Sequence, residues 1–344
     1  MNKTVKILVA LLIIVLVGFA ILSTRNSDPK IIKIGIVAPL TGGASVYGTN
    51  LVKGAELAIK ELVGNKNKYE LVIEDDATNP AMSASAAQKL INIDKVQGII
   101  SVTSGTGNAI KSIAMTTNTP HICLCSDSKV ADGIASFTNI LLAPDETKVW
   151  LTEAQSKGIK TIAILGQNQS GYNLILDSLR AQVADFGITI VYDEKFEPTI
   201  KDFNTSIAKV QAKKPDLVLI GFFPPQLDII GQQLKNLNVT NIAGIATFSI
   251  GADPKLFNNK WYTDASLSDT AFAQTFTTEY PDTRFNVRVA PYAYDSLNIM
   301  VKAIDSGKPI QYLLDTTSYS GKAGVATKNK GEASFHSPIG IWEI

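Results

Sequence analysis

The chain has few of the residues that usually build catalytic and metal sites. Only two of its 344 residues are cysteine and only two are histidine. Two cysteines cannot form a disulfide framework, so cysteine usage does not set the redox compartment. Lysine and arginine (32) nearly balance aspartate and glutamate (31), which leaves a formal net charge of +1. A nucleic-acid-binding protein normally shows a basic face, so we expect no nucleic-acid partner.

Signatures of enzymes are missing as well. The sequence contains no G-x-S-x-G, no H-E-x-x-H and no phosphate-binding G-x-x-x-x-G-K-[ST]. General base chemistry would have to rest on carboxylates, and no pair of them follows predicted strands in a suitable way. The acidic run 74–76 is interpreted as a solvated strand end rather than a metal cluster. We therefore expect no enzymatic activity, no cofactor and no metal.

One long uncharged run stands near the N-terminus. Residues 7–23 carry no charge and follow Lys3 and Lys6; about 17 residues is short for a membrane span but longer than most signal-peptide cores. No cysteine follows the run to accept a lipid, and the small-residue cleavage pattern is poor. We expect residues 1–28 to be an uncleaved anchor with the lysines inside, a cleaved signal being the alternative. In both cases the rest of the chain works outside the cytoplasm.

From residue 31 onward, short apolar runs alternate with longer amphipathic ones. The pattern predicts a strand at 31–40 and a helix at 48–64, and Asn79 followed by Pro80 is typical of a helix start. Strands that alternate with helices in this way predict an α/β fold with parallel sheets covered on both faces. The rhythm restarts near residue 160, so we expect two doubly wound lobes. Lobe 1 is predicted to comprise 31–145 and 265–318, and lobe 2 to comprise 146–264 and 319–344.

Ligands of open parallel sheets bind beyond the carboxyl ends of the strands, so residues just after strands are informative. Tyr47 follows a glycine turn in "PLTGGASVYG" and either covers a ligand or packs over the turn. Ser104, in "VTSGTGNAI", either holds an anion with its hydroxyl and the next N–H groups or merely caps its own helix. Phe223, in "GFFPPQ", is either a ligand contact or a core residue.

The stretch "HICLCSD" contains both cysteines and one histidine. In a straight strand His121, Cys123 and Cys125 would lie about 6 to 7 Å apart successively, too far to converge on one metal ion. The same spacing would strain a disulfide in an extended segment. We interpret the stretch as a buried strand that uses cysteine as a small hydrophobe. It then delivers Cys125, Ser126 and Asp127 to the ligand cleft.

A series of segments in order resembles a known family. The segments are "IKIGIVAPLTGGASVYGTNLVKGAELAIKEL", "LVIEDDATNPAMSASAAQKLI", "VQGIISVTSGTGNAIKSIA", "GIKTIAILGQNQSGY", "IKDFNTSIAKVQAKKPDLVLIGF" and "YAYDSLNIMVKAI". Together they resemble the type I periplasmic binding proteins, and within them the leucine/isoleucine/valine-binding proteins of ABC importers. The resemblance extends from about residue 31 to the end. It implies two α/β lobes, joined by three crossovers, that close on a small molecule.

The resemblance also implies a set of contact residues. In this family an aromatic residue after the first glycine turn covers the ligand, and a serine receives the ligand carboxylate. A further loop and two aromatic residues of the far lobe complete the set; the far-lobe tyrosine falls at Gly171 or Tyr172, because the order here is "GY". The predicted ligand-binding residues are Tyr47, Ser104, Cys125, Ser126, Asp127, Tyr172 and Phe223.

Two departures from the family pattern concern the ligand. The amino-acid binders pair the ligand's ammonium with an acidic residue, whereas residues 245–251 contain no Asp or Glu. Asp127 stands where a hydroxyl is expected and would attract an ammonium rather than a carboxylate. Either an amino acid binds with altered polarity, or the ligand is not an α-amino acid.

The sequence thus predicts an extracytoplasmic solute-binding protein for an ABC importer. We expect it to bind a small polar ligand, an amino acid or a related amide or carboxylate, and to present it as a monomer to an ABC permease in the membrane. The alternative is a sensor, in which the same module reports ligand to a membrane partner.

Overall fold

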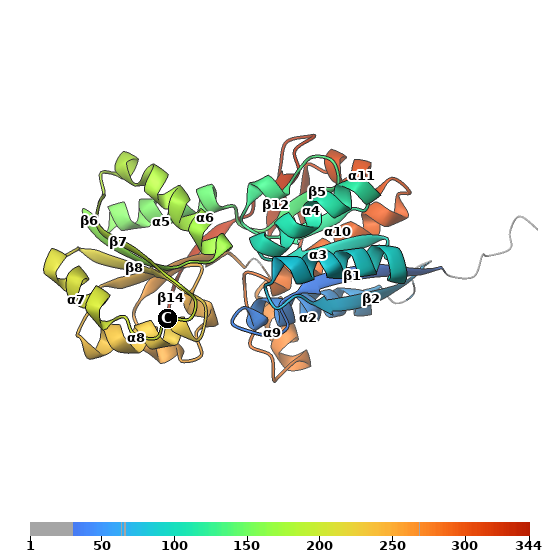
Figure 1. The fold of residues 1–344 in the computed structure, drawn as a ribbon. Coiled ribbons are helices and arrows are strands. Elements are labelled where there is room, and N and C mark those ends of the chain that lie inside the picture. Colours follow the sequence, from blue (N-terminus) through green and yellow to red (C-terminus); the bar gives the residue numbers. More distant parts are fainter. Residues whose placement is uncertain (1–29, 63, 65–66, 268) are drawn as a thin grey trace, which may run out of the picture.

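The computed structural model describes residues 30–344 apart from 63, 65–66 and 268. The expected anchor or signal segment, residues 1–28, lies outside these described residues. Within them, none of the helices combines the length and the apolar character needed to cross a bilayer. Figure 1 shows two lobes side by side, each built around one sheet covered by helices. The predicted α/β class with two parallel-dominated sheets is confirmed.

Lobe 1 contains a six-stranded parallel sheet in the order β13-β5-β4-β3-β1-β2. The central strand β3 is an almost wholly apolar run because both faces are covered, and all five of its residues are buried. The strands are β1 (Ile31–Ala38), β2 (Lys68–Asp75), β3 (Gly98–Val102), β4 (His121–Leu124), β5 (Ser136–Asn139) and β13 (Ser334–Phe335). The helices are α2 (Ser45–Glu61), α3 (Pro80–Lys89), α4 (Ser104–Thr117), α9 (Thr270–Glu279), α10 (Ala290–Asp305) and α11 (Pro309–Asp315).

Lobe 2 repeats the plan with the order β14-β10-β9-β8-β6-β7, in which only β14 runs antiparallel to its neighbour. The strands are β6 (Thr161–Gln167), β7 (Thr189–Phe196), β8 (Leu217–Gly221), β9 (Ile242–Ile245), β10 (Trp261–Ala265) and β14 (Ile339–Glu343). The helices are α5 (Ala143–Ser156), α6 (Ser170–Gln182), α7 (Asn204–Lys213) and α8 (Gln226–Asn236). Five short helical turns are distributed over both lobes: η1 (Leu90–Asp94) and η2 (Ser128–Val130) in lobe 1, and η3 (Val183–Phe186), η4 (Phe248–Ile250) and η5 (Pro254–Phe257) in lobe 2.

The chain crosses between the lobes after β5, after β10 and after β13. The third crossover corrects the expected boundary, because most of 319–344 belongs to lobe 1. The hairpin of β11 (Ser318–Ser320) and β12 (Val325–Thr327) is fixed there by Asp295 of α10, which accepts the N–H groups of Lys322 and Ala323 at 2.8 and 2.9 Å. The two-residue strand β13 then pairs with β5, and only β14 joins the sheet of lobe 2.

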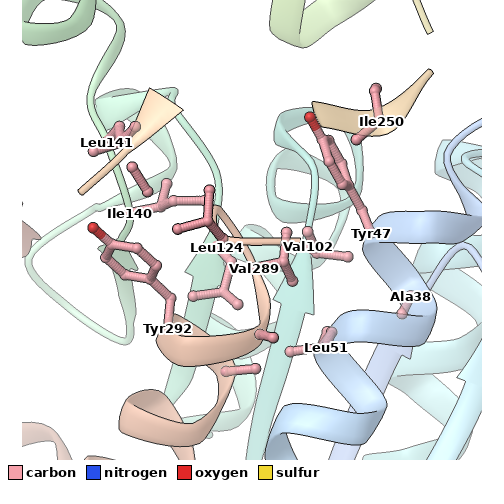
Figure 2. Close-up of a cluster of buried hydrophobic side chains, with 14 of the residues drawn as sticks. Ala38, Tyr47, Leu51, Val102, Leu124, Ile140, Leu141, Ile250, Val289 and Tyr292 are labelled. Carbon is pink, nitrogen blue, oxygen red and sulfur yellow. The ribbon is translucent and has the colours of Figure 1, made fainter. Parts of the chain in front are cut away.

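The core of lobe 1 reaches the carboxyl ends of its strands. Figure 2 shows Leu51 of α2, Val102 of β3, Leu124 of β4 and Val289 beside α10 in one apolar cluster. Each is at most 1% exposed, and full burial of such a side chain contributes about 1.5–3 kcal/mol. Tyr47 stands at the edge of this cluster, where it faces the other lobe. The core therefore holds the strand ends and the start of α2 rigidly against one another.

Candidate functional site

A cavity of about 200 Å³ lies between the two lobes at the carboxyl ends of their strands. This is smaller than the roughly 300–1,000 Å³ of pockets for drug-sized ligands, so it suits a small solute. Six of the seven residues predicted from the sequence line it. Lobe 1 contributes Tyr47, Ser104, Cys125 and Ser126, and lobe 2 contributes Tyr172 and Phe223.

The two lobes contact each other at this cavity through aromatic residues. The Tyr47 hydroxyl of lobe 1 donates to the Ala246 carbonyl of lobe 2 at 3.2 Å. The Phe223 ring lies 5.5 Å from the Tyr47 ring and 4.9 Å from the Tyr172 ring, between centroids. Burial raises the pKa of both tyrosines, so their hydroxyls remain protonated donors at neutral pH. The lobes are thus drawn together over the cavity.

The junction of β3 and α4 presents a free serine hydroxyl to the cavity. Thr103, not Ser104, is the N-cap of α4, and its side chain accepts from the Thr106 N–H at 3.3 Å. Ser104 is 4% exposed, and its hydroxyl forms no hydrogen bond with the described part of the chain. The alternative in which Ser104 only caps its helix is therefore not what the structure shows. Its hydroxyl and the start of α4 can meet an anion.

Three non-glycine residues at the cavity have left-handed backbone conformations. They are Thr78 (φ +61°), Thr103 (φ +80°) and Ala246 (φ +57°). Such conformations cost about 1–3 kcal/mol each and persist only where the surroundings impose them. A β-branched threonine at positive φ is especially unfavourable. These positions were not identified from the sequence, because backbone strain leaves no mark on the hydrophobic pattern.

Asp127 is the one predicted contact residue that does not line the cavity. Its carboxylate accepts the Lys129 N–H at 2.9 Å and an Asn108 side-chain N–H at 2.9 Å. Asp127 thereby caps the short turn η2 and ties it to α4. Aspartate is a strong capping residue, so local hydrogen bonding turns its side chain away from the cleft. The predicted role of Asp127 in charge selection is therefore corrected to a structural one.

A pair of substitutions tests this role for Asp127. Asp127→Ala is expected to lower the free energy of unfolding by about 1 kcal/mol, the usual cost of losing a cap. Asp127→Asn retains an oxygen acceptor and should lose less than half of that. Urea unfolding of the two variants beside the parent measures both values. Equal losses in the two variants would show that the charge, not the cap, is what matters.

The structure also corrects the prediction for the two cysteines. Cys123 and Cys125 form a disulfide, whereas the sequence predicted two separate small hydrophobes. The expectation assumed that both lie in an extended strand, but β4 ends at Leu124. The turn brings the Cα atoms to 5.4 Å, which lies within the usual range for a disulfide. Both residues are buried, and among the described residues no cluster of ligating side chains suits a metal ion.

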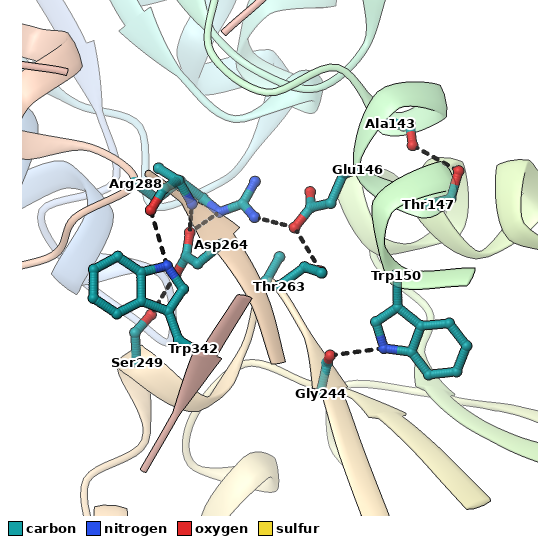
Figure 3. A network of polar contacts seen from close by, with 12 residues as sticks. Ala143, Glu146, Thr147, Trp150, Gly244, Ser249, Thr263, Asp264, Arg288 and Trp342 are labelled. Carbon is teal, nitrogen blue, oxygen red and sulfur yellow. Dashed lines mark hydrogen bonds and ion pairs between the residues drawn. The ribbon is translucent and has the colours of Figure 1, made fainter. Parts of the chain in front are cut away.

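Sequence reasoning missed a buried charge network beside the cavity (Figure 3). Arg288, just before α10, lines the cavity and is 4% exposed. Its Nε donates to Asp264 Oδ1 at 2.9 Å and its Nη2 donates to Glu146 Oε1. Burial alone would lower the pKa of Arg288, but these two carboxylates hold it above its usual value. Glu146 belongs to the start of α5 and Asp264 to β10, so the network joins both lobes where the chain crosses.

Residues 31–312 match the family described as periplasmic binding protein. The chain belongs to the periplasmic binding protein family. Among curated members, a Leu/Ile/Val-binding protein of Rhizobium johnstonii is 29% identical over 241 residues. That alignment covers 62% of this chain and spans only 61% of the relative's length.

Solved structures of the family share the fold of this chain. A branched-chain amino acid transporter substrate-binding protein of Streptococcus pneumoniae, in complex with isoleucine, has a TM-score of 0.81 at 21% identity and covers 92% of this chain and 96% of its own. A solute-binding protein of Rhodopseudomonas palustris, in complex with 3,4-dihydroxybenzoic acid, has a TM-score of 0.78 at 18% identity, with coverage of 91% and 93%. Membership of this family implies a location outside the cytoplasm.

Proposed function

We propose that this periplasmic binding protein captures a small solute with a carboxyl group between its lobes and delivers it to an ABC permease. The observation that carries the proposal is the cavity between the lobes. Residues of both lobes line it, and the lobes contact each other there through Tyr47 and Ala246. A solute that contacts both walls binds the closed arrangement better than the open one and so shifts the protein towards closure. The closed, ligand-bound form is then the one that a permease can recognise.

The carboxyl group is assigned to the start of α4. Ser104 offers an unused hydroxyl there, and the first N–H groups of the helix have no intrahelical acceptors. The ligands named for the two solved relatives, isoleucine and 3,4-dihydroxybenzoic acid, both carry a carboxyl group, which agrees with this assignment.

Ser104→Ala is expected to weaken binding of such a solute about tenfold or more, because a hydrogen bond to a charged group contributes about 1.5–3 kcal/mol. Ser112→Ala is the matched control, since Ser112 lies exposed on the same helix. A panel of amino acids and simple carboxylic acids is first screened by thermal unfolding. A ligand at 100 times its dissociation constant adds about 2.7 kcal/mol, which raises the Tm by a few degrees. Calorimetry then gives the affinity of each variant.

Two results would count against the proposal. If no solute in the panel raised the Tm, capture of a small carboxylate would be excluded for that range of ligands. If Ser104→Ala and Ser112→Ala bound equally well, the carboxyl group would not be held at α4. The delivery step is tested separately, by measuring uptake of the identified solute in cells with and without this gene.

A further inference from the structure

The cavity wall carries positive charge but no negative charge among the described residues. Arg288 is the only charged residue in the wall, and no Asp or Glu among the described residues lines it. The two carboxylates close by, Glu146 and Asp264, are both fully buried and both bound to Arg288. A solute in the cavity therefore meets a cation and donors, not a free carboxylate.

The carbonyl at the contact between the lobes is already engaged by a tyrosine hydroxyl. The Ala246 carbonyl is the group on which the lobes converge, and it lies 3.2 Å from the Tyr47 hydroxyl and 3.3 Å from the Tyr172 hydroxyl. The Tyr172 hydroxyl also lies 3.1 Å from the Phe222 carbonyl, and its single proton serves only one of these two carbonyls. An ammonium buried here would lie near Arg288 without a compensating carboxylate, which is strongly unfavourable.

Donors, in contrast, converge from both lobes. Helix α4 of lobe 1 begins at Ser104 and α6 of lobe 2 begins at Ser170, and both serines line the cavity. A Cβ atom on Gly105 would lie 3.5 Å from Ser170 Oγ, so the two helix starts nearly meet. Helix N-termini favour anions through their free N–H groups and their dipoles. Ser104, which is 4% exposed and whose hydroxyl has no partner among the described residues, offers a further donor at the same place.

Apolar side chains make up much of the remaining wall. Beyond the three aromatic rings, the cavity is lined by Val102, Leu124, Ile140, Ile175 and Val289. These side chains can bury hydrocarbon but offer nothing to a second polar group of a solute. The cavity thus offers much apolar surface beside the helix starts, together with the neutral polar side chains of Thr78, Ser126 and Gln169 and the cation of Arg288, and no carboxylate among the described residues.

From these observations we infer that the solute is a small monocarboxylic acid with an apolar body and no amino group. The carboxylate lies between the starts of α4 and α6, and the body packs against the aromatic and aliphatic wall. This inference rests on the proposed function and narrows it to one class of ligand.

Two pairs of probes that differ only in an α-amino group, and a third that exchanges the carboxylate for an amide, test the inference. Calorimetry on the purified full-length chain compares 4-methylpentanoate with L-leucine, 3-phenylpropanoate with L-phenylalanine, and benzoate with benzamide. We expect at least one acid to bind, and its amine-bearing or amide counterpart to bind at least about 30-fold more weakly. The cavity has no carboxylate to pair with the amine of an amino acid, and an amide lacks the negative charge that the helix starts favour.

Other outcomes separate the two proposals. Equal or tighter binding of an amino acid would overturn the ligand class and leave solute capture standing. Binding of amides or amines alone would do the same. Absence of binding for every acid, amino acid and amide would overturn both proposals.

A change of specificity provides a second test. Ala246→Asp adds a carboxylate to the wall at a position with φ +57°, a conformation that Asp and Asn tolerate better than alanine. We expect it to raise the affinity for L-leucine relative to 4-methylpentanoate at least about tenfold. Ala246→Asn has the same shape without the charge and should leave the ratio unchanged. A folded Ala246→Asp protein with the parent's ratio would contradict the inference.

Discussion

Arg288→Met is expected to lower the free energy of unfolding by about 3–5 kcal/mol, because it leaves two buried carboxylates without their cation. Glu146 and Asp264 are both 0% exposed, and Glu146 Oε2 already has no hydrogen-bond partner in the described structure. Burial raises the pKa of Glu146, and only the guanidinium opposes this effect strongly. Urea unfolding of parent and variant measures the loss, as a lower midpoint at similar slope.

Two further variants distinguish the network from a general effect of losing an arginine. Arg180 pairs with Asp177 and Asp193 on the surface of lobe 2, so Arg180→Met should cost at most about 1 kcal/mol. The triple variant Arg288→Met, Glu146→Gln, Asp264→Asn removes all three charges and should regain most of the stability. If the triple variant were no more stable than Arg288→Met, unpaired charge would not explain the loss.

The network also lies where stability and the proposed ligand capture meet. Arg288 contacts acids of lobe 2 while its backbone leads into α10 of lobe 1, so it lies where the lobes are joined. The same side chain is the only charge in the cavity wall among the described residues. Its two carboxylates use the Nε and Nη2 donors, and Nη1 forms no hydrogen bond with the described residues, so it is available to the carboxylate that we propose as ligand. One residue thus serves both the joint between the lobes and the polarity of the cavity.

The position of the site could be predicted from the sequence because ligand sites of this fold class occur at a fixed place relative to the strands. Apolar runs and helical periodicity located the strands, and ligands of parallel sheets lie at the carboxyl ends. Ser104 and Phe223 come just after strands, Tyr47 lies in the first turn of the helix that follows β1, and each lines the cavity. The direction of a loop side chain is not given by this rule, which is why Asp127 was misplaced: its local capping bonds decide where it points.

Arg288 could not be found by the same reasoning because it precedes a helix and follows no strand. One signal was available: a charged residue between two valines, in "NVRVAP", is unusual unless the charge is buried and paired. The strand β13 was missed for a different reason. Two residues carry no periodicity, and the sequence gives no sign of the contacts with Asp295 that keep the hairpin, and hence the chain before β14, in lobe 1.

His121 is held neutral in the middle of the lobe 1 sheet. It is 0% exposed, and its ring nitrogens lie 2.8 Å from the Ser101 hydroxyl and 3.1 Å from the Ser136 hydroxyl. Burial lowers the pKa of His121 to about 4, with Asp132 opposing this only weakly. In the unfolded chain the pKa is about 6.5, so the unfolded state takes up a proton first on acidification. The contribution of neutral His121 is therefore complete above pH 6.5 and is lost as the pH falls towards 4.

We expect the parent to lose about 3 kcal/mol more of its unfolding free energy than His121→Gln between pH 7 and pH 4, from about 1.4 kcal/mol per unit of pKa difference. The comparison with the variant is essential, because burial raises the pKa of Asp295 to about 6 and its protonation stabilises the folded state over the same range. His336→Gln provides the comparison with an exposed histidine, since the His336 side chain is 51% exposed and lies 2.7 Å from Asp145. Urea unfolding at half-unit steps of pH gives all three curves; parallel curves for the parent and His121→Gln would show that His121 does not carry this dependence.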